Sequence, residues 1–494
     1  MLVSPENPRE PGQIRVYAGL GILTVTLIYV WFISSGQWIN WHTTTGFYNL
    51  LADGFRHGQV SLVLKPDPKL LALQNPYDPN ARTGIDYPID VSLYHGKYYL
   101  YFGPLPGLIV AVLGGVFPDG IGDQYLVFAF TLGIFVVQSL LLLKIRQLFF
   151  PTLPLWTILF GMLLAGLLGP FTRLLVHPHI YEAALSGGQF FFMAGLYFTI
   201  LAVSGDPARN VWLFLAGTSF IFSAASRIMQ VLPILFMTAM ISALLFRRAL
   251  RYGSMRPLIQ PLAALFLPLL LGGAALAWYN WVRFGSIFEF GYYYQLAYNL
   301  QSFYHTLFLP AYIPQNLYNY FLNPVTLVGT SPFVNPLPGN KTPIFGFYNL
   351  PQPYIIDGYI TGLLYGSPFI IFAILPFIVP AAEWLRKGLF PTTLEWKRPG
   401  GLYGWMLLSL GGCFTVAAAP ILLFFYAATR YETDFFSALG LLAILGFWEG
   451  WMLLTNRIIP RDLFAALAVF IGLVSIGLNS LIAFASHLSW FGIF

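Results

Sequence analysis

Arginine residues stand at the ends of two long apolar runs, where a guanidinium could bind an anion. Arg227 closes one run in the string Ser-Ala-Ala-Ser-Arg, and Arg430 opens another in Arg-Tyr-Glu-Thr-Asp, together with Tyr431 and Asp434. The flat fork of a guanidinium matches the oxygens of a phosphate. We expect Arg227 and Arg430 to bind a phosphate, with Tyr431 and Asp434 beside them. The alternatives are that Arg227 snorkels towards water and that Arg430 pairs with an acid of its own string.

A second polar group contains two histidines and a glutamate. His177 and His179 flank a proline, and Glu182 follows at the start of another apolar run. These side chains are metal ligands in many proteins, but a His-Pro-His string is not the i, i+4 pair of a helical metal site. A divalent cation site and a plain polar helix start are therefore the two interpretations of this group, and the helix start is the simpler one.

Two aspartates are candidates for a general base. Asp53 lies in the string Ala-Asp-Gly-Phe, and Asp90 opens Asp-Val-Ser-Leu-Tyr-His-Gly-Lys-Tyr-Tyr-Leu-Tyr-Phe-Gly-Pro. A carboxylate beside a hydroxyl group can remove its proton during nucleophilic attack. The alternative is that each aspartate caps a helix or a turn. No Gly-x-Ser-x-Gly nucleophile motif and no phosphate-binding P-loop occur, and one cysteine, Cys413, cannot form a disulfide.

Composition places these residues in a membrane protein. Of the 494 residues, 57% are hydrophobic and 9% are charged, whereas soluble domains carry about 25% charged residues. The apolar residues form long blocks rather than alternating with polar ones, which excludes an outer-membrane barrel. No basic face or tail is present for binding nucleic acid. The sequence therefore predicts an all-α polytopic membrane protein, which we expect to form a single domain over residues 1–494.

About eleven stretches are long enough to cross a membrane as helices, since a span needs about 20 apolar residues. They are 16–35, 124–143, 155–175, 185–204, 211–228, 229–246, 257–280, 358–382, 403–427, 435–454 and 462–485. The stretch 104–117 is shorter and suits a helix at the membrane surface.

The distribution of charge predicts the orientation of the chain. With residues 1–15 as a cytoplasmic tail, 15 of the 25 Lys and Arg residues fall in cytoplasmic loops, among them the cluster at 247–256. This agrees with the tendency of cytoplasmic loops to collect Lys and Arg. No cleavage site follows the first apolar run, so we expect the first helix to be retained.

Two long outer segments, 36–123 and 281–357, connect the spans in this arrangement. Both are rich in aromatic residues, and long ordered loops usually have a function. Residues 46–59 place Phe47, Leu50, Leu51 and Phe55 on one helical face. With 104–117, this predicts two juxtamembrane helices in the first outer segment.

This arrangement resembles the GT-C superfamily of membrane glycosyltransferases, which includes protein O-mannosyltransferases and aminoarabinose transferases. The resemblance is carried by residues 48–58, by the Pro-Leu segment from Gly103 to Phe117 and by the string 430–435. The long string that begins at Asp90 is similar to one in a subfamily of bacterial membrane proteins. The chain departs from the family just before Tyr48, where residues 39–46 contain no acid.

The resemblance implies transfer of a sugar from a polyprenyl-phosphate donor to an acceptor on the outer face of a bacterial plasma membrane. Asp53 or Asp90 would act as the base, and Arg227, Arg430, His177 and His179 would bind the donor phosphate. Tyr94, Tyr98, Glu182, Tyr431 and Asp434 would contact the sugar or the acceptor, although interfacial aromatics also serve as membrane anchors. Besides lipids, the partners would be an acceptor glycan, lipid or protein.

Two other functions remain open. A GT-C-like subunit without catalytic activity would bind the other proteins of a membrane complex through its aromatic outer segments. A transporter would need ionisable residues in the middle of its spans, and the sequence has few there, chiefly Glu449 near a cytoplasmic end.

Overall fold

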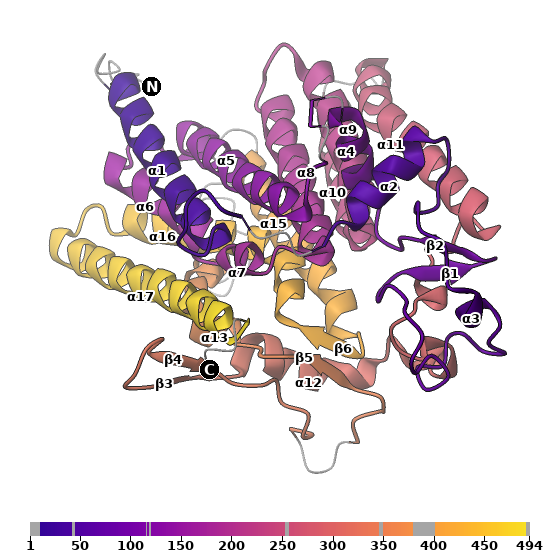
Figure 1. The fold of residues 1–494 in the computed structure, drawn as a ribbon. Coiled ribbons are helices and arrows are strands. Elements are labelled where there is room, and N and C mark those ends of the chain that lie inside the picture. The colour runs from indigo at the N-terminus through magenta and orange to yellow at the C-terminus, as the bar shows by residue number, and fades with distance from the viewer. Residues whose placement is uncertain are drawn as a thin grey trace.

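A bundle of long helices forms most of the molecule (Figure 1). The computed structural model describes residues 10–41, 45–114, 116–117, 120–251, 256–344, 349–378 and 401–490. Within this part of the chain, eight helices are long and apolar enough to cross a membrane. They are α1 (Glu10–Ile33), α5 (Asp123–Phe149), α8 (Ile180–Val203), α10 (Val231–Arg251), α11 (Arg256–Phe284), α15 (Leu402–Leu422), α16 (Thr433–Leu453) and α17 (Ile458–Trp490). The chain is a multi-pass membrane protein, as its composition predicts.

Three of the eleven expected spans differ from the prediction. The stretch 155–175 is divided into α6 (Leu155–Leu167) and α7 (Phe171–Val176). The break falls at Pro170, whose ring disfavours a helical conformation in the residue before it. The stretch 211–228 forms α9 (Arg209–Ser226), which begins with the polar residues Arg209 and Asn210 and is not among the eight helices.

The third difference is the stretch 358–382. It contains the short α13 (Leu363–Gly366) and the 3-10 helix η7 (Pro368–Ile374). Pro368 separates them, because proline has no N–H to continue the helix. Residues 379–382 lie outside the described part of the chain, as do residues 1–9 of the expected tail and residues 252–255 of the basic cluster.

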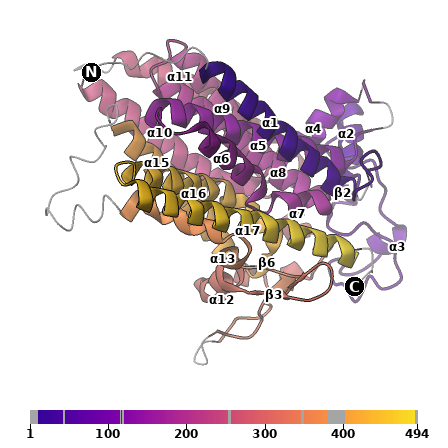
Figure 2. The same ribbon diagram turned by 90° about the vertical axis from the view of Figure 1, so that its left-hand side faces the viewer.

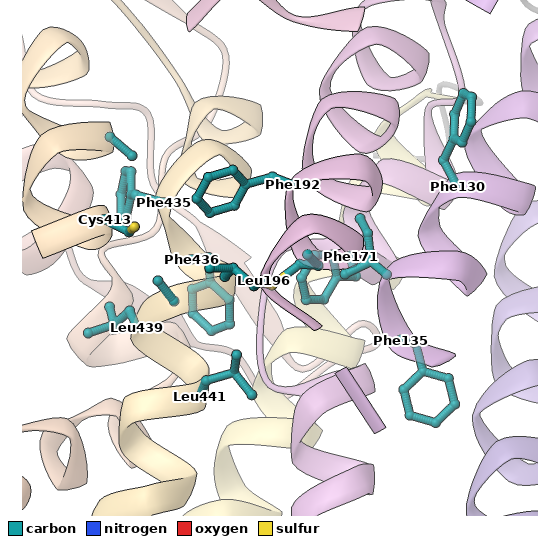
Figure 3. Close-up of a cluster of buried hydrophobic side chains, with 14 of the residues drawn as sticks. Phe130, Phe135, Phe171, Phe192, Leu196, Cys413, Phe435, Phe436, Leu439 and Leu441 are labelled. Carbon is teal, nitrogen blue, oxygen red and sulfur yellow. The ribbon is translucent and has the colours of Figure 1, made fainter. Parts of the chain in front are cut away.

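Helix α16 occupies the centre of the bundle, where it contacts α6, α8, α15 and η7. A cluster of aromatic side chains fills this centre, with Phe171, Phe192, Phe435 and Phe436 converging from three helices (Figure 3). Phe171 and Phe436 meet edge to face with their ring centroids 6.1 Å apart, an arrangement that aromatic quadrupoles favour. Small residues allow the backbones of neighbouring helices to approach closely. Gly446 on α16 packs directly against the backbone of η7 in this way.

The first long segment contains the two short helices that its sequence predicts. They are α2 (Phe47–Arg56) and α4 (Leu105–Leu113), which pack against each other. Arg56 donates to the carbonyl of Val110 at 2.9 Å, which attaches α2 to the end of α4. Between them lie α3 (Pro68–Leu71) and the antiparallel hairpin of β1 (Ser92–Tyr94) and β2 (Lys97–Tyr99).

The second long segment consists of short turns and strands. Its elements are η2 (Tyr292–Tyr294), η3 (Leu300–Ser302), η4 (Tyr304–Thr306), η5 (Pro310–Tyr312), α12 (Ile313–Leu317), the π-helical turn η6 (Tyr318–Leu322), β3 (Val325–Leu327), β4 (Val334–Pro336) and β5 (Ile355–Asp357). Strands β3 and β4 form an antiparallel hairpin. Strand β5 pairs in parallel with β6 (Tyr426–Ala428), which is followed by η9 (Thr429–Glu432) and α16.

Both segments lie at one end of the bundle, which we call the loop end (Figures 1 and 2). The β5–β6 pair joins the second segment to the start of α16. An isolated bridge between Ser92 and Gln295 joins the first segment to the second. The loop end therefore combines residues that are far apart in the sequence.

The close contact at Gly446 makes a testable prediction about packing. An added Cβ at Gly446 would lie 1.9 Å from the carbonyl oxygen of Phe372, so Gly446→Ala should destabilise the protein by about 1–3 kcal/mol. Gly273 in α11 meets nothing within 4 Å, and Gly273→Ala should be neutral or stabilising by up to about 1 kcal/mol. Thermal unfolding in detergent compares the two variants. Equal melting temperatures would contradict the packing at the centre of the bundle.

Candidate active site

Asp90 occupies a bend just before β1, where two partners orient its carboxylate. Tyr181 at the start of α8 donates its hydroxyl hydrogen to one oxygen, and Gln295 donates to the other at 2.8 Å. The backbone has φ = +65°, a left-handed conformation that aspartate adopts more readily than most residues. Burial raises the pKa of the Asp90 carboxyl, although Arg430 and the Gln295 hydrogen bond oppose this shift. Two hydrogen bonds thus fix the orientation of the Asp90 carboxylate, and burial makes it more basic than a free aspartate.

Arg430 lies next to Asp90 on η9 and forms an ion pair with Asp357 at the end of β5. Its guanidinium stacks over the ring of Tyr181, 4.6 Å from the centroid, and cation–π attraction stabilises such a pair. The Nε atom of Arg430 is buried and has no hydrogen-bond partner among the described residues. Buried donors are usually satisfied, so this N–H is available to a ligand.

Arg227, directly after α9, forms a buried ion pair with Asp434. Nη2 and Nε of Arg227 lie 2.8 and 3.4 Å from the two carboxylate oxygens. Gln230 also donates to Asp434, at 3.0 Å. The guanidinium of Arg227 and that of Arg430 each lie 5.4 Å from the ring centroid of Tyr431, so both arginines contact this one aromatic ring. The Asp434 carboxylate therefore neutralises Arg227, and its contacts in the structure are to protein groups.

The two histidines and Glu182 form the start of α8. His179 and Glu182 make a reciprocal capping box, in which the Glu182 carboxylate accepts from the His179 backbone N–H at 3.2 Å. Burial lowers the pKa of His177 to about 4, and the nearby His179 and His487 add to the effect. His177 is consequently neutral at pH 7.

These residues line two adjoining cavities. The first, of about 500 Å³, we call the apolar cavity, because aromatic and aliphatic side chains make most of its wall. Its residues with chemical function are Asp90, Tyr181, Arg227, Gln295, Arg430 and Tyr431. The second, of about 550 Å³, we call the polar cavity. It is lined by Arg173, His177, His179, Glu182, Asp357 and Ser486, among others.

The two cavities share one wall, formed by Asp90, Tyr181, Tyr426 and Arg430. Gly103, in the lining of the apolar cavity, allows a close backbone contact. A Cβ at this position would lie 2.0 Å from the carbonyl oxygen of Ala225. The loop before α4 can therefore approach the end of α9, beside Arg227.

Other candidates lie apart from these cavities. Asp53 on α2 is exposed and pairs with Arg56 at 2.8 Å. Tyr98 is buried within the first segment, and Tyr94 packs against Tyr294 with a centroid distance of 4.6 Å. None of the three predicted residues lines either cavity.

Sequence reasoning missed four residues of the site. Gln295 binds Asp90, Asp357 binds Arg430, and Arg173 forms a buried ion pair of 2.8 Å with Glu432. Asp357 and Glu432 stand at the outer boundaries of predicted spans, and this position could have marked them as candidate site residues. Gln295 has no local signal, because a neutral amide in an aromatic loop resembles many others.

A divalent cation does not fit this donor set. Within the described ranges, no three His, Cys, Asp or Glu side chains gather as ligands. Glu182 instead caps α8, and Asp357 binds Arg430.

Comparison with known proteins gives a likeness of fold. No family model and no curated protein matches the sequence. The oligosaccharyltransferase of Archaeoglobus fulgidus in its apo form aligns with a TM-score of 0.45 and 14% identity, covering 95% of this chain and 56% of that one. The archaeal oligosaccharyltransferase AglB from Archaeoglobus fulgidus, in complex with an inhibitory peptide and a dolichol-phosphate, aligns with a TM-score of 0.46 and 12% identity, covering 96% of this chain and 56% of that one. The chain spans just over half the length of these structures, and the likeness assigns no residue or activity.

The Arg227–Asp434 pair yields a stability prediction. Arg227→Met should lower the free energy of unfolding by about 3–5 kcal/mol, because Asp434 would remain as a buried charge without its partner. Adding Asp434→Asn should recover most of this loss, since the amide is uncharged and keeps an oxygen for Gln230. Thermal unfolding of both variants measures the difference.

The matched control is the exposed pair of Arg461 and Asp462, 2.9 Å apart. Breaking it by Arg461→Met should change the stability by about 1 kcal/mol or less. If the double variant were no more stable than Arg227→Met, an unpaired charge on Asp434 would not be the cause of the lost stability.

Proposed function

We propose that the chain is a membrane glycosyltransferase that moves a sugar from a polyprenyl-phosphate donor to an acceptor hydroxyl. One observation carries the proposal: Arg227 and Arg430 line one largely apolar cavity whose wall also contains the Asp90 carboxylate. The cavity offers apolar walls and two guanidiniums. A lipid phosphate matches both, because it has an apolar chain and an anionic group. The bacterial plasma membrane and a cytoplasmic N-terminus belong to the same proposal.

The donor phosphate would contact the free guanidinium donors. Arg430 has its buried Nε without a partner among the described residues, and Arg227 uses only Nε and Nη2 on Asp434. Charge-assisted hydrogen bonds from both arginines would hold the phosphate and stabilise the negative charge that develops when it leaves. Tyr431 contacts both arginines and lines the same cavity, where it would limit the approach of the sugar.

Asp90 would act as the general base. Its carboxylate uses one hydrogen bond on each oxygen and keeps lone pairs for a third. It would take the proton from the acceptor hydroxyl as the acceptor oxygen bonds to the anomeric carbon. The bond from that carbon to the phosphate oxygen breaks, and its electron pair leaves with the polyprenyl phosphate. Inversion at the anomeric carbon is part of the proposal.

Lipid binding tests the phosphate site. Wild-type protein in mild detergent should retain added undecaprenyl phosphate in native mass spectrometry, and Arg430→Ala should lose at least nine-tenths of this retention because the charged donors are removed. Arg461→Ala serves as the control, since Arg461 lies at the far end of the bundle beside Asp462. Equal retention by Arg430→Ala and wild type would overturn the phosphate site.

Catalysis tests the base. Asp90→Asn should reduce sugar transfer by about 10²–10⁴-fold, measured with undecaprenyl-phosphate sugars added as donors. Asp53→Asn makes the same chemical change outside the cavities and should leave transfer near the wild-type rate. The reverse result would assign the base to Asp53.

The pH dependence follows from the direction of the Asp90 pKa. A general base must be deprotonated, so the rate should fall as the pH drops through its pKa. Because burial raises that pKa, the fall should occur at a higher pH than the value of about 3.9 for a free aspartate. The measurement is the initial rate of transfer between pH 4 and pH 8, on the order of one reading per half unit. A rate that stays constant over this range would exclude Asp90 as the base.

A further inference from the structure

A third cavity adjoins the polar cavity at the loop end. This third cavity, of about 250 Å³, lies between the β3–β4 hairpin and α17. It shares Pro336, Tyr359 and Ser486 with the polar cavity. The three cavities therefore form a row, with Asp90 at the first junction and Tyr359 at the second. A row of this kind suits a ligand that is longer than one chemical unit.

Hydroxyl groups are frequent along the polar cavity. Tyr181, Tyr359, Thr361, Thr429 and Ser486 all line it. The hydroxyl of Thr361 is buried and has no hydrogen-bond partner within the described residues. Leaving a buried polar group unsatisfied costs about 1–3 kcal/mol, so a ligand that bonds to Thr361 would gain this amount.

The charges of the polar cavity disfavour an anionic ligand. Asp90, Glu182 and Asp357 line it, against the two guanidiniums of Arg173 and Arg430. The polar cavity therefore has more acids than guanidiniums in its lining, whereas the apolar cavity has Asp90 alone against Arg227 and Arg430. An anion in the polar cavity would be repelled by the excess of carboxylates.

A cationic amine also fits poorly. An ammonium group only donates hydrogen bonds, so it cannot accept one from the hydroxyl groups of this wall. A hydroxyl group both donates and accepts. A neutral, hydroxyl-rich molecule can therefore satisfy the carboxylates, the guanidiniums and the hydroxyls together.

We propose that the polar cavity and the third cavity form one groove for a neutral oligosaccharide, which presents its terminal hydroxyl to Asp90. This inference deepens the proposed function by naming the class of acceptor, and it rests on the role of Asp90 given there. The residues nearest to Asp90 bind the accepting sugar. The β3–β4 hairpin and α17 bind the units behind it.

Chain length provides the test. Isothermal titration of the full chain in lipid nanodiscs compares two neutral series, maltose against maltohexaose and chitobiose against chitohexaose. In at least one series the hexamer should bind tenfold or more tightly than the dimer, because only the longer chain reaches the third cavity. Equal affinities, or no binding in either series, would overturn the groove.

Two variants locate the binding. Asn335 lines the third cavity from the exposed hairpin, and Asn335→Trp should reduce hexamer affinity to that of the dimer without changing dimer affinity. Thr361→Val should weaken dimer and hexamer alike, by about fivefold or more. Thr218→Val is the control, since the Thr218 hydroxyl bonds within α9 to the carbonyl of Phe214.

Competing ligands complete the experiment. Tighter binding of hexagalacturonate, which is anionic, or of a serine-rich peptide than of both neutral hexamers would overturn the proposal. Retention of undecaprenyl phosphate is measured on the same preparation. Sugar binding without lipid retention would reject the donor site and keep the groove, and the opposite result would reject the groove alone.

Discussion

The need to neutralise charge at the edge of an apolar bundle organises the loop end. Arginine and carboxylate side chains lose hydration there, and each charge must find an opposite charge or a hydrogen bond. Arg227 meets Asp434, Arg173 meets Glu432, and Arg430 meets Asp357. These pairs join the ends of α9, α7 and β5 to the segment that begins α16. The bundle and the site thus share the same interactions, and the arginines that would bind a donor also hold helices together.

The carboxylate at the centre of the site depends on contacts between the two long segments. Gln295 from the second segment binds Asp90 of the first, and Leu296 donates its backbone N–H to the carbonyl of Val91 at 2.8 Å. Arg82 is almost fully buried and donates to the carbonyl of Leu296, also at 2.8 Å. A guanidinium fixed in this way restrains both segments, because releasing it would leave several buried donors unsatisfied. Asp90 therefore keeps its orientation although it lies on an irregular loop.

A shared wall gives the two adjoining cavities complementary chemistry. The apolar cavity offers aromatic surface and free guanidinium donors, which suit a lipid phosphate. The polar cavity offers carboxylates and hydroxyls, which suit a neutral sugar. Asp90 and Arg430 face both, so a proton acceptor and a cation lie where donor and acceptor would meet. The proposed transfer needs these two functions at that point, one for the incoming hydroxyl and one for the leaving phosphate.

The sequence alone determined the class of the protein and the location of its polar residues. Length of apolar runs and scarcity of charge are local properties, and they predict a helical membrane protein because each span must satisfy its own backbone hydrogen bonds. Amphipathic spacing likewise predicted α2. Helix breaks were harder to predict, because residues 155–175 and 358–382 are mostly apolar and their prolines act through local geometry. Only the tertiary structure distinguished Asp90, which lies between two cavities, from Asp53, which lies outside both cavities and pairs with its neighbour Arg56. It also decided that Asp434 neutralises Arg227 across 207 residues of sequence. Such pairs depend on how distant helices pack, and no periodicity within one segment contains that information.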